Sequence, residues 1–177
     1  MPSGPYRSRV EQGNAEAILI RVLLTQPVWQ DQILEELGKL EADELPGESD
    51  ATTALEDELP GILRDDVYRA IYEAVRTHGV EADPELLTSG LDPLAIHVYE
   101  QLRGEADAVV DARRSIADAL RQLRSRSLEV RVRTLESLLP LADASEKDRI
   151  NVQIKQLADE KRALGVPSWG SVRKSRA

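Results

Sequence analysis

The residue types that most often carry out chemistry are few in this sequence, and they form no recognised pattern. There is no cysteine, which excludes disulfides, thiolate metal sites and a cysteine nucleophile. The two histidines, His78 and His97, fall on different predicted segments, and we interpret both as structural residues rather than as metal ligands or general bases. Catalytic groups must converge in one cleft. The spacing of these residues does not indicate such a site.

Carboxylates are the remaining candidates for metal binding. Asp65 and Asp66 are adjacent, and neighbours on a helix point about 100° apart, so they do not converge on one ion. The acidic stretch 41–59 lacks the alternating ligands and central glycine of a calcium loop. The ten glycines form no phosphate-binding motif. We therefore predict no catalytic residue, no metal site and no cofactor, and we interpret the chain as a non-enzyme.

Capping and breaking residues predict the bounds of the first helices. Asn14 is a suitable N-cap for a helix over 15–24, which ends before Pro27 because the residue preceding a proline is pushed out of the α region. A second helix is predicted over 28–40. The acidic stretch 41–59 contains a Pro-Gly pair and shows no periodicity, so we predict a loop there.

Three more helices are predicted between residues 62 and 104. Apolar residues at helical spacing from Ile62 to Ala74 predict a helix that ends at Gly79. The next two helices share one start signal, an aspartate N-cap followed by proline, at Asp83 and at Asp92. Both are expected to be short.

The C-terminal part has longer elements. No glycine or proline occurs over 111–139, which predicts one long helix that Pro140 ends. Ser145 is the predicted N-cap of a last helix, with Asp148 completing a variant of the capping box. The apolar residues of this last helix form a narrow seam: Ile150, Ile154, Leu157 and Leu164.

These elements predict an all-α fold, a bundle of short helices followed by a long connecting helix and a C-terminal helical hairpin. The lack of phenylalanine leaves a core of Leu, Ile, Val and Ala, which suits packed helices. The predicted organisation is a disordered lead-in over 1–13, a helical bundle over 14–110, a long helix and hairpin over 111–165, and a flexible basic tail over 166–177.

Charge is distributed unevenly along the chain. Residues 41–105 carry 17 acidic and 4 basic side chains, whereas residues 106–177 carry 10 acidic and 15 basic ones. The acidic middle repels phosphates, and the basic end suits an acidic protein surface, a nucleic acid or plain solvation. No apolar run reaches the length of a signal peptide core or a membrane span, so a cytoplasmic protein is expected.

The order of these segments resembles the C-terminal helicase-binding domain of bacterial replicative primase, the DnaG type. In "AEAILIRVLLTQPVWQDQIL", the Ala-Glu pair, the spaced leucines and the leucine pair before proline are similar to the opening of that domain. "LRDDVYRAIYEAV" is similar to its next helix. "VVDARRSIADALRQLRSRSLEVRVRTLESLL" and "EKDRINVQIKQLADEKRAL" are similar to its long connecting helix and its final helix. The resemblance covers about residues 14–165.

This resemblance implies a docking domain that contacts the N-terminal collar of the replicative hexameric helicase and couples priming to unwinding. The chain would then contain neither the zinc-binding nor the polymerising domain of a primase, and it is expected to be monomeric alone. Exposed leucines beside a turn often mark an interface, and a lone tryptophan in a polar tail often anchors one. The predicted partner-binding residues are Leu138, Leu139, Leu141, Arg149, Gln153, Gln156 and Trp169.

Two other functions fit the same sequence. The N-terminal collar domain of the replicative helicase shares part of this design and would self-assemble. A basic helical module that binds nucleic acid is the third reading, although the arginines are spread around the long helix with acids between them. Trp169 has a second reading as well, as a residue folded back onto the bundle.

Overall fold

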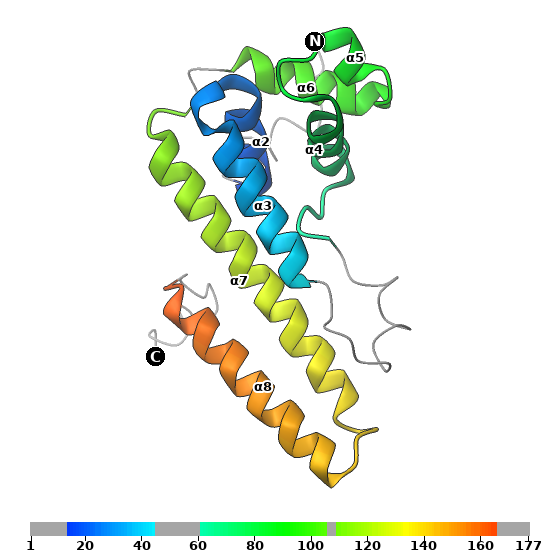
Figure 1. The fold of residues 1–177 in the computed structure, drawn as a ribbon, viewed down its shortest axis with the longest axis vertical. Coiled ribbons are helices and arrows are strands. Elements are labelled where there is room, and N and C mark those ends of the chain that lie inside the picture. Colours follow the sequence, from blue (N-terminus) through cyan, green and yellow to red (C-terminus); the bar gives the residue numbers. More distant parts are fainter. Residues whose placement is uncertain (1–13, 45–60, 106–108, 166–177) are drawn as a thin grey trace, which may run out of the picture. The chain divides into compact units, whose positions relative to one another are not determined.

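The computed structural model describes residues 14–44, 61–105 and 109–165 of the 177-residue chain. Within these ranges every regular element is a helix, so the predicted all-α fold is confirmed (Figure 1). The predicted lead-in over 1–13 and the predicted tail over 166–177 lie outside the described residues.

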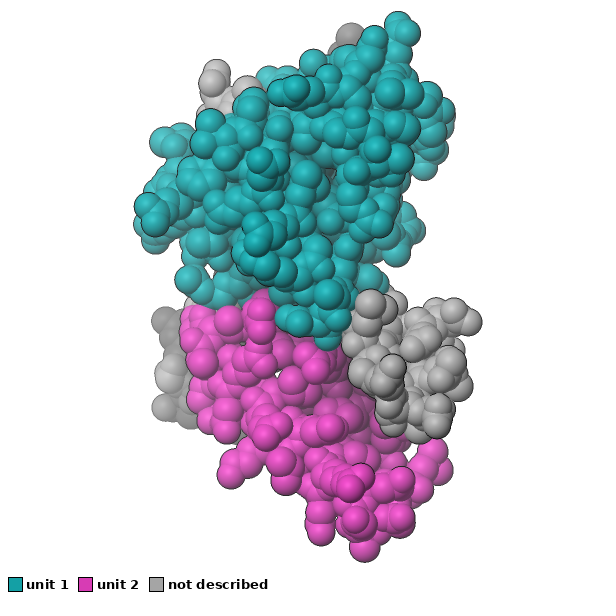
Figure 2. All heavy atoms as spheres, in the orientation of Figure 1, with its two compact units in different colours: residues 1–123 teal, residues 124–177 magenta. Residues whose placement is uncertain are grey.

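The chain divides into two compact units, residues 1–123 and residues 124–177 (Figure 2). The division falls inside the long helix, α7 (Ala112–Leu138), whereas the sequence placed it near residue 110, ahead of that helix. The first half of α7 belongs to unit 1 because its apolar residues are buried in the core of that unit. These residues are Ala112, Ile116, Ala119 and Leu123.

The first helix, α2 (Ala15–Thr25), begins where the sequence predicts. The Asn14 side chain accepts a hydrogen bond from the Glu16 backbone N–H at 3.0 Å. Eight of the eleven residues of α2 are buried, so its nearly continuous apolar run reflects packing on several sides rather than on one face. Its partners within unit 1 are α3 (Gln30–Glu44), α4 (Asp66–His78) and α6 (Pro93–Gly104).

The second predicted helix differs from its expected bounds at both ends. Residues Pro27–Trp29 form a 3₁₀ turn, η1, and α3 begins directly after it. Because α3 continues to Glu44, the first four residues of the predicted loop 41–59 are helical, and the rest of that loop lies outside the described residues. The extension is supported by an ion pair at 3.1 Å from Glu41 to Arg76 of α4.

The next helix, α4, starts later than the apolar pattern predicts. Ile62 was placed on its helical stripe but lies ahead of the helix, although its side chain is buried. The start is fixed by Asp65, whose side chain accepts a hydrogen bond from the Val67 N–H at 3.0 Å and caps the helix. The predicted end is confirmed, since Gly79 follows the helix with a φ of 82°, a conformation that favours glycine.

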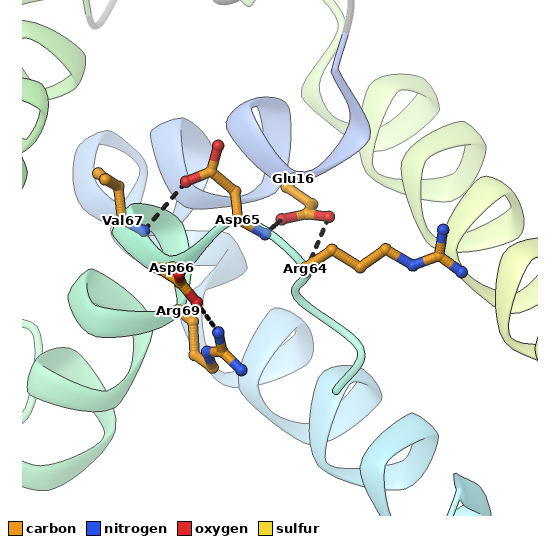
Figure 3. A network of polar contacts seen from close by, with 6 residues as sticks. All are labelled: Glu16, Arg64, Asp65, Asp66, Val67 and Arg69. Atoms are coloured by element: carbon orange, nitrogen blue, oxygen red, sulfur yellow. Dashed lines mark hydrogen bonds and ion pairs between the residues drawn. The ribbon is translucent and has the colours of Figure 1, made fainter. Parts of the chain in front are cut away.

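A buried carboxylate connects α2 to the start of α4 (Figure 3). Glu16 is only 2% exposed, and its two side-chain oxygens accept hydrogen bonds from the backbone N–H groups of Arg64 at 3.1 Å and Asp65 at 3.0 Å. Nearby, Asp66 and Arg69 form an ion pair at the surface. Glu16 thus holds the segment that leads into α4 against the central helix of unit 1.

Two short helices complete the bundle, α5 (Pro84–Thr88) and α6. Both begin as predicted, with an aspartate cap followed by proline. Asp83 accepts a hydrogen bond from the Glu85 N–H at 3.0 Å, and Asp92 accepts one from the Ala95 N–H at 2.8 Å. Helix α5 packs on α4, while α6 packs on both α2 and α4.

An ion pair connects α2 to the end of α6 at the edge of the core. Arg21 of α2 is largely buried, and its Nη2 atom lies 2.7 Å from Oε2 of Glu105, the residue that follows α6. Around it the core is mostly aliphatic, as the composition predicts. Tyr68 and Tyr72 of α4 are its largest fully buried side chains.

The long helix matches its prediction closely. Helix α7 spans Ala112–Leu138, within one residue of the predicted 111–139 at each end. It runs without interruption, residues 124–127 included. Asp111 caps its start, since its side chain accepts a hydrogen bond from the Arg114 N–H at 3.1 Å.

The last helix, α8 (Ala144–Ala163), begins earlier than predicted. Its N-cap is Asp143 rather than Ser145. The Asp143 side chain accepts a hydrogen bond from the Glu146 N–H at 2.9 Å, and the Glu146 side chain accepts one from the Asp143 N–H at 3.2 Å. This reciprocal capping box satisfies two N–H groups at once, whereas Ser145 with Asp148 would start the helix two residues later.

Candidate partner-binding surface

Unit 2 contains the second half of α7, the turn after it, and α8. The turn is held by backbone hydrogen bonds from the Leu139 N–H to Glu136 O at 3.3 Å and from the Leu141 N–H to Leu138 O at 3.1 Å. Asp143 then starts α8. The chain reverses within five residues, which is typical of an αα-hairpin.

The apolar seam predicted for α8 is the face of that helix that is turned away from solvent. Leu157 is buried, and Ile150, Ile154 and Leu164 are half-buried. Among the apolar residues that the structure describes in unit 2, Leu128 of α7 is the other buried one. The hairpin is therefore held by a narrow strip of apolar contacts rather than by a core with several layers.

Ion pairs join α7 to α8 far from the turn. Arg124 donates from both Nε and Nη2 to Oε1 of Glu160, at 3.0 and 2.6 Å. Lys161 lies 3.6 Å from Glu129, whose other oxygen is 2.9 Å from Arg133. These side chains are partly exposed, so each pair contributes at most about 1 kcal/mol. They fix how α8 is aligned along α7 more than they add to the stability of the hairpin.

The predicted leucines at the turn differ in accessibility. Leu138 and Leu139 are half-buried at the end of α7, while Leu141 is 87% exposed. An exposed leucine at a helix–helix turn adds little to the hairpin itself. Of the three predicted leucines, Leu141 is therefore the one most available to a partner.

The predicted polar residues of α8 lie on one exposed stripe. Arg149, Gln153 and Gln156 are all exposed, and their spacing of four and three residues places them on one face of the helix. The sequence prediction missed Val152, which is 56% exposed on the same stripe. Its spacing of three residues from Arg149 was the available signal. We refer to Leu141, Arg149, Val152, Gln153 and Gln156 as the outer hairpin surface.

The remaining candidate residues do not add to this surface. Trp169 lies outside the described residues. His78 and His97 are exposed on different helices of unit 1. In the described ranges no group of three or more His, Asp or Glu side chains is placed to hold a metal ion, and no helix is long and apolar enough to cross a membrane.

Comparison with known proteins gives no relative. No protein-family model, no curated protein and no solved structure matches this chain. The resemblance to the primase domain therefore stays a prediction. The function has to be argued from the surface that the hairpin presents.

Proposed function

We propose that this chain is a non-catalytic docking domain of a DNA primase that binds the replicative hexameric helicase and thereby couples priming to unwinding. The outer hairpin surface makes the contact in this proposal. The order of the sequence segments supports the primase reading, and the accessibility of the hairpin supports docking at that surface. The two lines of support are independent of each other.

One observation carries the proposal, the exposure of α8. Only Leu157 of its 20 residues is buried, although most of the stability of helices in proteins comes from tertiary packing. Leu141 and Val152 add exposed apolar area at the turn and along the stripe. A helix that has so little buried surface of its own has a face to offer to a partner.

Nucleic acid binding has less support, because acidic residues neutralise much of the basic charge on α7. Arg121 lies 2.8 Å from Asp118, and Arg124 is bound to Glu160. Phosphate binding requires lysines and arginines that release counterions from the nucleic acid. An arginine already paired with a carboxylate contributes less to that release.

Titration of the full chain against the cognate hexameric helicase, followed by sedimentation, tests the proposal. We expect a saturable complex and a chain that is monomeric by itself. Leu141→Asp should weaken binding by about tenfold or more, because it places a charge in a contact that the partner would bury. Val152→Glu should weaken binding as well.

Val28→Asp is the matched control. Val28 lies in unit 1 and is 86% exposed, almost the same fraction as Leu141, so the substitution adds the same charge and removes an apolar side chain of similar exposure. Helicase affinity should be unchanged. Equal losses from Leu141→Asp and Val28→Asp would refute the surface assignment. A chain that forms its own oligomer and no complex would favour the helicase-collar reading instead.

A further inference from the structure

A groove lies between α5 and α6 in unit 1. It has a volume of about 450 Å³, is open to solvent and is lined by residues of both helices, among them Pro84, Glu85, Thr88, Tyr99, Glu100 and Arg103. Small-molecule sites enclose most of their ligand. An open groove bounded by two helices is better suited to a segment of polypeptide.

Acidic side chains border this groove. Glu85 of α5 and Glu100 of α6 are exposed, and neither forms an ion pair within the described part of the chain. Three more exposed acids lie in the segments just before these two helices and extend the negative surface: Glu81, Asp83 and Asp92. The unneutralised carboxylates create a negative potential at the groove.

Arg103 is the one lysine or arginine in the sequence between residues 77 and 112. It lies at the groove, where its Nη1 atom donates to the hydroxyl of Tyr99 at 3.4 Å. A single guanidinium cannot balance Glu85, Glu100 and the acids around them. The groove therefore keeps a net negative charge.

Many acidic side chains on the other helices lie next to a basic side chain of the same or a neighbouring helix. Described examples are Glu35 with Lys39, Glu73 with Arg76, Asp118 with Arg121, Glu129 with Arg133, and Asp159 with Arg162. Glu85 and Glu100 form no such pair within the described residues, and both border the same groove.

We propose that this groove binds a basic segment of a partner protein through the lysine or arginine side chains of that segment. Charge complementarity selects the basic residues, with one of them placed between Glu85 and Glu100. A nucleic acid is disfavoured because its phosphates would face these carboxylates.

The Lys or Arg stem has a surface to lie on. Tyr99 and Pro84 line the groove, and long basic side chains commonly cover apolar area with their methylene groups while the charged end stays in water. The proposal concerns α5 and α6 only. It holds whether or not the hairpin docks on a helicase.

A labelled peptide tests this inference on the full chain. The probe is a fluorescein-labelled peptide of Lys and Ala, and binding is followed by fluorescence anisotropy at low and high salt. We expect saturable binding that weakens with salt. The double variant Glu85→Gln with Glu100→Gln should raise the Kd by about tenfold or more.

The double variant Glu35→Gln with Glu36→Gln is the control, since it removes the same charge from α3 of the same unit, where Glu35 is exposed and Glu36 is half-buried. Its Kd should stay within about threefold of the parent value if recognition is local. Equal losses in both double variants would show non-specific attraction and overturn the proposal, as would an absence of binding.

Discussion

Helix α2 in unit 1 and helix α8 in unit 2 differ sharply in how much of their surface the fold buries. Eight of the eleven residues of α2 are buried, compared with one of the twenty residues of α8. Apolar burial is the main favourable term in folding, at roughly 25 cal/mol per Å². The bundle thus has a stability of its own, while α8 keeps most of its side chains accessible.

Polar contacts follow the same division. In unit 1 a fully buried carboxylate, Glu16, binds two backbone N–H groups. In unit 2 the inter-helix polar contacts are ion pairs between half-exposed side chains, such as Arg124 with Glu160. Buried hydrogen-bonded groups are costly to disrupt, whereas exposed pairs are exchanged with water at little cost. The comparison predicts a rigid bundle and a hairpin that opens more easily.

The largest expected difference is in the apolar contacts. Leu19→Ala in α2 should lower the free energy of unfolding of unit 1 by about 2–5 kcal/mol, because a fully buried leucine leaves a cavity. Leu157→Ala in α8 should cost roughly half as much, since a thin seam can collapse onto the smaller side chain. Urea denaturation followed by hydrogen exchange, resolved by unit, measures both. Equal losses of free energy of unfolding from the two substitutions would contradict the expected difference between the two units.

The second largest effect is expected at Glu16. In Glu16→Gln an amide NH₂ replaces one carboxylate oxygen and faces a backbone N–H, so one buried hydrogen bond is lost. We expect a cost of about 1–3 kcal/mol. Exchange should accelerate from residue 61 through α4, while α8 is unaffected. Glu35→Gln, at an exposed position of α3, is the control and should change stability by less than about 0.5 kcal/mol.

The bundle shows which features sequence reasoning can locate. Asp83 and Asp92 were identified as caps because each precedes a proline, and this local signal fixes the start of a helix without tertiary help. Ile62 was wrongly assigned to α4 because an apolar residue indicates burial but does not by itself indicate helical structure. Asp65, three residues later, starts α4, since its side chain caps the Val67 N–H.

The hairpin shows the limits of the same reasoning. Ser145 with Asp148 and Asp143 with Glu146 are competing capping boxes in overlapping registers, and glutamate is the better third residue, so the earlier start is adopted. The role of Glu16 could not be found from spacing. Its partners, the N–H groups of Arg64 and Asp65, are 48 and 49 residues away, and only the fold brings them together. Which residues of α8 are exposed could likewise be learned only from the structure. The helical spacing from Arg149 would nevertheless have placed Val152 on the same face.

A smaller effect is expected from the ion pairs of the hairpin. Glu160→Gln should destabilise the contact of α8 with α7 by at most about 1 kcal/mol, and less at high salt. Exchange should accelerate in the second half of α8 without a change in the bundle. Asp159→Asn is the matched control, because Asp159 pairs with Arg162 inside α8. A loss of stability in unit 1 would show that the two units unfold together.

The smallest effect concerns the corresponding pair in unit 1, Glu41 with Arg76. Burial raises the pKa of the Glu41 carboxyl above its ordinary value of 4.5, while the guanidinium of Arg76 acts in the opposite direction. The folded chain therefore holds this proton more tightly than the unfolded chain does. The contribution of Glu41 favours the fold below pH 4.5 and is lost as the pH rises through the raised pKa.

Glu41→Gln removes this titration. Relative to the Gln variant, the parent chain should lose stability between about pH 4 and pH 7, by less than about 1 kcal/mol because the carboxylate is partly exposed. Urea midpoints of both chains at several pH values across this range measure the difference. If the parent chain instead gained stability with rising pH, attraction to Arg76 would outweigh burial. The pair in unit 1 would then behave like the solvent-exposed pairs of the hairpin.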